Sequence, residues 1–360
     1  MRIQKLTLTN YKNISTKSFD FKSSINCFIG NNGVGKSNIL DAIYHLAFGK
    51  SFFNPNSVQN IQFDKTFFVI EGSFKIESRN EKVNCSFKKG QKKVLKRNNK
   101  IYSKMSEHIG LIPLVMISPD DIDLINEGSI LRRKFIDGIL GQIHKDYLMN
   151  IINYNRIIAQ RNSLLKYFAI NHTFDQKTID IYNSQLHDLS LPIYKRRKEF
   201  MEVFSPLLIK RYDAINSGNE KVKLKYKSSL DDNSLMDLLN SSIKKDRTFQ
   251  YTTEGIHKDD LDFLIHDKQI KKFGSQGQKK SFLIALKIAQ FDYLRSKKGM
   301  SPIILLDDIF DKLDQKRVEH LLKLIIEEGF GQIFLTDTHY DRTLNALELI
   351  NSNFELFNIN

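Results

Sequence analysis

The chain has 360 residues, enough for two packed domains or for one large α/β domain with an insertion. It has no run of about 18 apolar residues and no apolar signal-peptide core at the N-terminus, which argues against a membrane span and against secretion. Its only two cysteines, Cys27 and Cys85, stand in no metal-ligand spacing, which argues against a disulfide scaffold and a zinc site. We therefore expect a soluble cytoplasmic protein. The formal net charge of +14 favours a polyanionic partner, nucleic acid before a membrane surface, although a chain rich in lysine, asparagine and isoleucine is also consistent with an AT-rich genome.

The N-terminal part of the chain predicts strands around one helix. Residues 2–9 alternate apolar and polar positions, as a half-buried strand does, and residues 24–29 form a short apolar run. Residues 38–48 carry apolar side chains at helical spacing. Alternation returns over residues 60–105, where Asn98-Asn99 is typical of a tight hairpin turn. The strands expected in that stretch are 67–70, 73–76, 83–87 and 94–97.

The middle of the chain differs from both ends. From residue 129 to residue 210 the helical period dominates, and no heptad pattern runs far enough to predict a long coiled coil. Residues 215–245 are polar and include lysines that alternate as on one face of an exposed strand, namely Lys221, Lys223, Lys225 and Lys227. We expect a mainly helical lobe over residues 116–249.

After residue 249 the α/β pattern returns. The expected elements are helices at 281–294 and 321–326 and strands at 302–306 and 332–336. The two ends of the chain, residues 1–115 and 250–360, are therefore expected to form one discontinuous α/β core with a mixed β-sheet.

The clearest motif lies between the expected strand 24–29 and the expected helix 38–48. It fits G-x-x-x-x-G-K-[ST] with the residues Gly30, Asn31, Asn32, Gly33, Val34, Gly35, Lys36 and Ser37. In such a loop, backbone N–H groups surround the phosphates of a nucleotide, and the helix N-terminus adds a favourable dipole. Lys36 is expected to reach the β- and γ-phosphates and Ser37 to ligate Mg²⁺, which predicts ATP and Mg²⁺ as cofactors. The alternative is a glycine-rich turn that binds no ligand. In that case the expected strand before the motif and the expected helix after it would be there by chance.

A second motif is the apolar run 303–306 followed by Asp307 and Asp308. A buried strand that ends in an acid can bring a carboxylate to a metal ion. Asp307 is the candidate Mg²⁺ ligand, and Asp308 could orient or deprotonate an attacking water. A strand-end acid that caps a turn is the alternative, and the phosphate loop elsewhere in the chain favours the metal site.

A third motif, Phe273-Gly274-Ser275-Gln276-Gly277-Gln278, comes directly before a long helix. Taken alone it is typical of a helix cap, although an exposed helix N-terminus also suits an anion. The three motifs in this order resemble the ATP-binding-cassette superfamily, and Leu313-Asp314 matches its D-loop. This resemblance implies a head-like ATPase fold, in which Ser275, Gly277 and Gln278 of one subunit cap the ATP of another, so that ATP drives formation of a homodimer.

Further stretches narrow the resemblance to the bacterial RecF family of recombination mediators, over nearly the whole chain. They are Ser118-Pro119-Asp120-Asp121-Ile122-Asp123-Leu124-Ile125, Leu131-Arg132-Arg133-Lys134-Phe135-Ile136-Asp137, Tyr154-Asn155-Arg156, Gln160-Arg161-Asn162-Ser163-Leu164-Leu165 and Gly255-Ile256-His257-Lys258-Asp259-Asp260-Leu261. The resemblance implies a cytoplasmic protein of recombinational repair and replication restart that binds double-stranded and gapped DNA. It further implies help, together with RecO and RecR, in loading RecA, and a weak DNA-stimulated ATPase that works as a dimerisation switch.

The chain departs from the usual family pattern at a few positions. Gln276 stands where a basic residue usually follows the signature serine, and Lys12 and Lys258 stand where arginines are usual. A lysine keeps the charge of an arginine but loses its bidentate fork. The glutamine of the cassette Q-loop has only positional candidates, Gln59 and Gln62, and His339 stands where cassette proteins have a switch histidine.

A basic cluster lies on and around the expected hairpin at Asn98-Asn99. Its members are Lys88, Lys89, Lys92, Lys93, Lys96, Arg97 and Lys100. A basic hairpin can follow a phosphate backbone without reading its sequence, and a solvated loop is the alternative.

Two other functions compete with that of a repair switch. A structural chromosome-organising ATPase of the SMC type would need a long coiled coil between the phosphate loop and Ser275, and the sequence has none. The ATPase of an anti-phage nuclease system would need an acidic metal site beyond the ATPase core, and only a short stretch follows Asp308.

Overall fold

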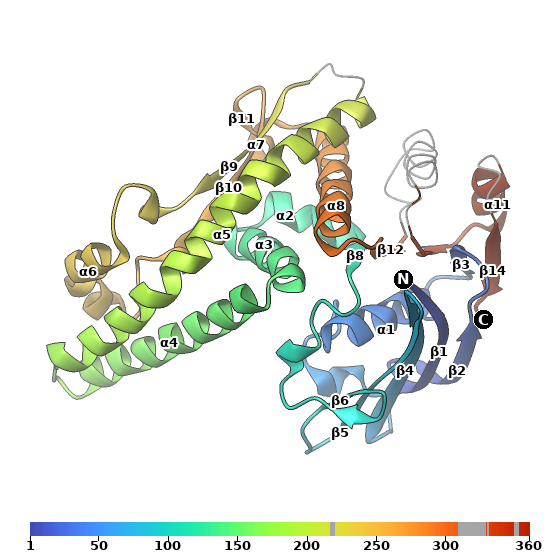
Figure 1. Cartoon of the computed structure of the whole chain (residues 1–360), viewed down its shortest axis with the longest axis horizontal. Coiled ribbons are helices and arrows are strands. Elements are labelled where there is room, and N and C mark those ends of the chain that lie inside the picture. The colour runs from blue at the N-terminus through green and yellow to red at the C-terminus, as the bar shows by residue number, and fades with distance from the viewer. Residues whose placement is uncertain (217–219, 309–328, 330, 349–352) are drawn as a thin grey trace. The chain divides into compact units, whose positions relative to one another are not determined.

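The structure, a computed structural model, describes residues 1–216, 220–308, 329, 331–348 and 353–360 (Figure 1). These residues form two compact units. The first unit comprises Met1–Asp121 and Leu286–Asn360, and the second comprises Ile122–Ala285. The chain returns from the second unit to the first within one long helix, α8 (Gln276–Lys298).

A six-stranded antiparallel sheet begins the first unit. Its order is β2 (Ile14–Asp20), β1 (Arg2–Tyr11), β4 (Phe67–Ile76), β5 (Arg79–Lys88), β6 (Val94–Arg97) and β7 (Lys100–Ile101). In β1, Ile3, Leu6 and Leu8 are buried. Leu6 stands opposite Phe19 of β2 and Gly72 of β4. The apolar side chains therefore cover one face of the sheet, as the alternating sequence predicts.

A five-stranded parallel sheet carries the C-terminal part of the unit. Its order is β14 (Phe354–Asn358), β3 (Ile25–Ile29), β13 (Ile333–Asp337), β12 (Ile303–Leu306) and β8 (Leu114–Ile117). All residues of β3, β8, β12 and β13 are buried. This agrees with their nearly continuous apolar sequences, which are typical of strands covered on both faces. Parallel and antiparallel pairing thus occur in separate sheets of the described chain.

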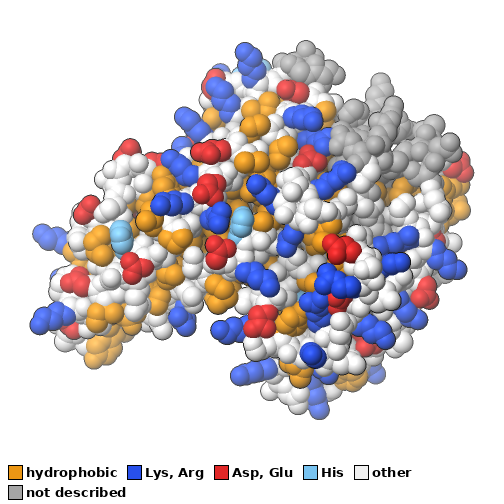
Figure 2. Space-filling view, viewed as in Figure 1, with side chains coloured by type: hydrophobic (Ala, Val, Ile, Leu, Met, Phe, Trp, Pro, Cys, Tyr) orange, Lys and Arg blue, Asp and Glu red, His pale blue; other side chains and the backbone are white. Residues whose placement is uncertain are grey.

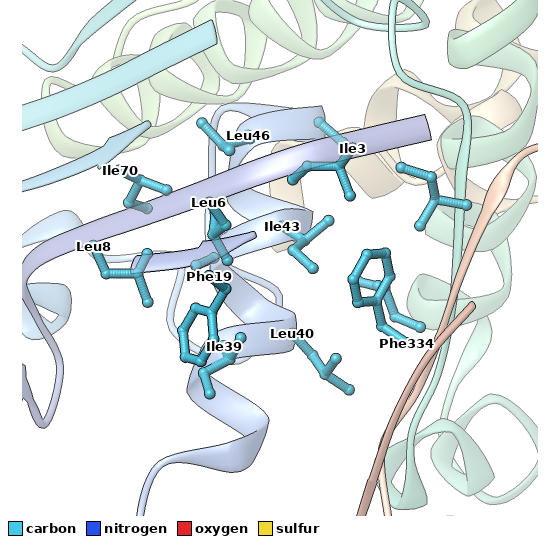
Figure 3. Close-up of a cluster of buried hydrophobic side chains, with 14 of the residues drawn as sticks. Ile3, Leu6, Leu8, Phe19, Ile39, Leu40, Ile43, Leu46, Ile70 and Phe334 are labelled. Atoms are coloured by element: carbon cyan, nitrogen blue, oxygen red, sulfur yellow. The ribbon is translucent and has the colours of Figure 1, made fainter. Parts of the chain in front are cut away.

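The helix α1 (Lys36–Phe48) connects the cores of these two sheets. Its buried residues Ile39, Leu40, Ile43 and Leu46 belong to one apolar cluster with side chains of β1, β2, β4 and β13 (Figure 3). Gly49 ends the helix in the left-handed conformation, with φ of 65°. The cluster holds the first turn of α1 at the end of β3. Among the described residues this unit also has the helices η1 (Ser57–Asn60), η2 (Met105–Glu107) and α11 (Tyr340–Glu348), and η3 (Pro119–Ile122) lies at its boundary with the second unit.

The second unit is mainly helical, with a small antiparallel sheet. Helices α4 and α5 lie side by side as an antiparallel hairpin, and α5 continues through Pro192 and Pro206 (Figure 1). The described helices that lie wholly in this unit are α2 (Asp123–Asn126), α3 (Ser129–Ile143), α4 (Lys145–Ile170), α5 (Gln176–Asn216), η4 (Ser229–Asp231), α6 (Leu235–Phe249), η5 (Ile256–Lys258) and α7 (Ile270–Phe273). The sheet has the order β11 (Lys268–Gln269), β10 (Asp260–Ile265) and β9 (Val222–Lys227).

Two buried arginines tie the segments of this unit together. Arg161 of α4 donates to Asp246 of α6 over 2.7 Å and to Thr252 over 2.8 Å. Arg197 of α5 pairs with Asp137 at 2.9 Å and with Asp259 at 2.8 Å. Several residues of the family-like stretches are therefore part of the interior of the unit, where a charge needs such partners.

Two features of the fold differ from the sequence expectations. One strand, β4, replaces the two expected at 67–70 and 73–76. Gly72, which interrupts the apolar pattern, lies inside the strand. It is glycine because a Cβ there would stand 2.6 Å from Leu46 of α1. Residues 250–285 pack with the helical unit, since β10 pairs with β9 along its whole length. The expected helix 321–326 lies outside the described residues.

Candidate functional site

The phosphate loop connects β3 to α1 at the carboxyl end of the parallel sheet. Gly33 and Gly35 have φ of 84° and 106°, a backbone region that other residues rarely adopt. A Cβ on Gly35 would also stand 2.6 Å from the Asn13 side chain. The loop therefore requires glycine at these two positions for its shape.

Lys36 turns its side chain back into the loop. Its Nζ donates to the carbonyl of Gly30 over 2.9 Å and to that of Asn31 over 3.0 Å. Asn13, in the turn between β1 and β2, supports the loop from outside by donating to the Gly33 carbonyl over 3.1 Å. The arrangement holds one positive charge at the N-terminus of a helix, where an anion is also favoured by the helix dipole.

Asp307 lies directly after β12, and its carboxylate is almost completely buried. The Thr336 hydroxyl donates to Asp307 Oδ1 over 2.9 Å. Burial raises the pKa of Asp307 to about 6, and the charge of Asp308 adds to the rise, while hydrogen bonds from Ser37 and Thr336 oppose it. Ser37 and Asp307, far apart in the sequence, are therefore hydrogen-bond neighbours. A hydroxyl beside a carboxylate is an oxygen donor pair of the kind that Mg²⁺ uses together with nucleotide phosphates.

Asp308 has a left-handed backbone, with φ of 42°, and is only partly buried. Its N–H donates to Thr336 Oγ1 over 2.9 Å. Thr336 thus contacts both acids at the end of β12, and nothing in the sequence singled it out. Its only sequence signal is its place near the end of a neighbouring parallel strand.

Ser37 and Asp307 open onto a cavity of about 740 Å³. Its other lining residues are Lys12, Asn13, Asn38, Phe53, Asn54, Gln59, Ile61, Gln62 and Phe63. A cavity of this size suits a small-molecule ligand. Both positional candidates for the Q-loop are among the lining residues, whereas His339, between β13 and α11, is exposed and is not among them.

Ser275 and Gln278 form a reciprocal cap at the N-terminus of α8. Ser275 Oγ accepts from the Gln278 N–H over 3.1 Å, and Gln278 Oε1 accepts from the Ser275 N–H over 2.7 Å. Gln278 also donates to Glu220 over 2.7 Å. Ser275 is exposed and Gly277 partly exposed, so this helix end is open to solvent within the second unit. Asp314, the D-loop candidate, lies outside the described residues.

The basic cluster divides into an exposed part and an inward part. Lys88, Lys89, Lys92 and Lys100 are exposed, while the remaining members, Lys93, Lys96 and Arg97, are partly buried. Arg97 pairs with the buried Glu81 at 2.5 Å, and its hydrogen bonds lower the pKa of Glu81. Burial, aided by the charge of Lys50, lowers the pKa of Lys93. Over the face in Figure 2, Lys and Arg side chains are interspersed with acids rather than gathered in one patch.

None of the helices that the structure describes has both the length and the apolar character needed to cross a membrane.

Comparison with known proteins gives a family for the whole chain. Residues 2–355 match the RecF/RecN/SMC N terminal domain family. The chain is 54% identical to the DNA replication and repair protein RecF of Flavobacterium johnsoniae, covering 100% of both chains. It is 43% identical to the protein of that name from Phocaeicola vulgatus, covering 99% of this chain and 96% of the relative.

Solved structures agree with this result. A structure of the recombination mediator protein RecF with ATP matches with a TM-score of 0.88 and 29% identity, over 94% of this chain and 92% of that chain. A structure of RecF-ATPrS matches with a TM-score of 0.90 and 27% identity, over 100% and 96%. An Smc head bound to a domain of ScpA matches with a TM-score of 0.55 and 17% identity, over 96% and 91%, which is a similarity of fold alone.

Proposed function

The chain belongs to the RecF family of DNA replication and repair proteins, and we propose that it is a switch on DNA operated by ATP. The observation that carries this proposal is the meeting of Lys36, Ser37 and Asp307 at one end of the parallel sheet. Lys36 supplies the positive charge for the phosphates, and Ser37 and Asp307 supply oxygen ligands for Mg²⁺. Bound Mg²⁺ would offset the negative charge of the phosphates. Asp308 orients the attacking water in a slow hydrolysis that resets the switch.

The state that ATP favours is a homodimer. Ser275, Gly277 and Gln278 stand at an exposed helix end, which can receive an anion from a second subunit. Reciprocal contacts of this kind close a two-fold dimer. ATP binding and dimerisation are then thermodynamically linked, so each strengthens the other.

Sedimentation of the full chain tests this part of the proposal. With Mg²⁺ and ATP, the wild type is expected to move from monomer to dimer. Lys36→Met is expected to remain a monomer because it no longer binds ATP, and Ser275→Arg is expected to bind ATP yet remain a monomer. A wild type that binds ATP but remains a monomer at every protein concentration tested would refute the switch.

The DNA partner is double-stranded and gapped DNA, and the exposed lysines at 88, 89, 92 and 100 are the proposed contacts. They can pair with phosphates without sequence preference. Replacing these four lysines by glutamate is expected to weaken DNA binding and to flatten its dependence on salt. The matched control replaces four exposed lysines of the second unit, Lys166, Lys177, Lys195 and Lys210, with the same change in net charge. Equal losses in both variants would mean that net charge alone, and not the hairpin, governs binding.

The protein partners proposed for the chain are RecR and RecO, with which it would help to load RecA on gapped DNA. The support for this step is the family itself and the match to solved structures of the recombination mediator RecF in the RecFOR pathway. A RecA-loading assay on gapped DNA with the partners from the same organism tests it. The expected result is faster loading only when ATP-competent protein is present, with Lys36→Met as the inactive control.

A further inference from the structure

A buried carboxylate lies directly behind the cavity that Ser37 and Asp307 line. Asp41, on α1, is fully buried. Its Oδ2 accepts from the Tyr11 hydroxyl over 2.7 Å and from the Ser51 hydroxyl over 2.6 Å, and its Oδ1 accepts from the Phe52 N–H over 2.6 Å. A buried carboxylate carries a high desolvation cost, and these donors offset part of it.

The fourth partner of Asp41 is a cation of the cavity wall. Lys12 Nζ stands 2.6 Å from Asp41 Oδ2, and its side chain is only 10% exposed. Its ammonium also lies 5.1 Å from the centre of the Phe53 ring. Among the described residues that line the cavity, Lys12 carries the one positive charge.

The backbone at Lys12 also departs from ordinary geometry. Its φ is 53°, in the left-handed region that a lysine seldom adopts, and its N–H donates to the Asn60 carbonyl over 3.0 Å. Strain of this kind persists where surrounding contacts enforce it, and it gathers at functional sites. The ion pair with Asp41 is one of the contacts that hold this side chain in place.

Asp41 also contacts a second segment that lines the cavity. Its hydrogen bonds to Ser51 and Phe52 fix the start of the segment 51–63. Ser51 in turn accepts from the Asn54 N–H over 2.9 Å. This segment supplies Phe53, Asn54, Gln59, Ile61, Gln62 and Phe63 to the cavity lining. One carboxylate thus joins the helix after the phosphate loop to two walls of the cavity.

We propose that Asp41 is a positioning residue of the nucleotide cavity, which holds the ammonium of Lys12 at the wall where it meets the anionic ligand. The proposal rests on the ATP binding proposed above. An ammonium held in advance loses less side-chain entropy when the ligand arrives, so the pair raises affinity by preorganisation. Asp41 does not touch the ligand and acts through Lys12.

A double-mutant cycle tests this dependence in the full chain. ATP affinity is measured with Mg²⁺ for wild type, Asp41→Asn, Lys12→Met and the double variant. Each single change is expected to weaken binding roughly tenfold, which is the scale of an interaction of about 1.4 kcal/mol. The double variant is expected to bind no more weakly than Lys12→Met alone, since Asp41 then has no cation to position. A double variant whose loss equals the product of the two single losses would overturn the proposal.

Two controls separate positioning from simple loss of structure. Asp246→Asn removes a matched carboxylate, fully buried and paired with Arg161 at 2.7 Å in the second unit, and it is expected to leave ATP affinity unchanged. Lys12→Arg keeps the cation and is expected to bind within about twofold of wild type. If Asp41→Asn does not fold, Lys12→Met tests the contact on which the proposal depends: a tenfold loss supports a contact of Lys12 with the ligand, and wild-type affinity overturns the proposal.

The cycle also distinguishes this inference from the proposed function on which it rests. Failure of the wild type to bind ATP would refute the proposed function. If the wild type binds ATP, Lys36→Met does not, and Asp41→Asn and Lys12→Met bind as the wild type does, only the role of Asp41 is refuted.

Discussion

Replacement of Asp307 by asparagine tests the residue proposed to bind Mg²⁺ through the stability of the protein without ligand. Asp307 is only 4% exposed, and burial raises its pKa from 3.8 to about 6. At pH 7 the folded protein must therefore hold an ionised carboxylate in a place that disfavours it. A pKa difference of this size corresponds to about 3 kcal/mol at pH 7. Asparagine removes the charge and retains an oxygen for the Thr336 hydroxyl.

The expected effect has a defined sign and pH dependence. A raised pKa means that the folded state binds the proton of Asp307 more tightly than the unfolded state does. The protonated carboxyl therefore contributes to stability below the unfolded pKa, and this contribution is lost as pH rises through about 6. Asp307→Asn should therefore raise the free energy of unfolding by up to about 3 kcal/mol at pH 7, and by about half of that at pH 5. Near pH 4 the difference should nearly vanish.

Urea unfolding at pH 7, 5 and 4 measures this difference. Spectroscopic probes in the second unit serve as an internal control, because its stability should not respond to the change. The same variant should lose the stabilisation that Mg²⁺ with ATP gives to the wild type, which is about 2.7 kcal/mol at a ligand concentration of 100 times Kd. A variant less stable than wild type at pH 7, or a gain that does not change between pH 7 and pH 5, would refute the reasoning.

Three further predictions concern the loop, the helical unit and the basic hairpin. Gly35→Ala should lower the free energy of unfolding by more than about 1 kcal/mol and weaken ATP binding. The control Gly90→Ala, where φ is 81° but a Cβ meets nothing within 4 Å, should lower stability alone. Urea unfolding and ATP titration check both variants. Arg161→Met should lower the free energy of unfolding by about 3–5 kcal/mol because it leaves its buried aspartate partner unpaired; an unchanged urea midpoint would contradict this. Arg97→Ala should reduce the melting temperature with little effect on DNA affinity, whereas Lys100→Ala should reduce DNA affinity with little effect on the melting temperature. DNA titrations at two salt concentrations and thermal melts distinguish the two variants.

The sequence alone was sufficient to predict features that depend only on residues close together in the chain. The phosphate loop is a short run in which glycines, a lysine and a serine must follow one another, and the structure has it between β3 and α1. The turn at Asn98-Asn99 was also readable, since both residues have a positive φ, which asparagine tolerates better than most residues. The acids after β12 could be expected near the loop, because the carboxyl ends of parallel strands meet at one edge of the sheet.

Contacts between distant segments could not be read in this way. Thr336 between Asp307 and Asp308, Asn13 against the loop, and Asp41 behind Lys12 depend on which strand lies beside which, and no local pattern marks them. Every member of the basic cluster is a lysine or arginine, yet the members differ in structure: Lys93, Lys96 and Arg97 are partly buried, and Arg97 pairs with Glu81.

The sequence by itself thus determined the nucleotide loop, the order of its companion motifs and the family of the chain. Only the tertiary structure decided which walls surround the loop, because side chains more than a few residues apart meet through strand order and packing. It joined Ser37 to Asp307 and Lys12 to Asp41, and it separated the exposed lysines of the basic cluster from its partly buried members.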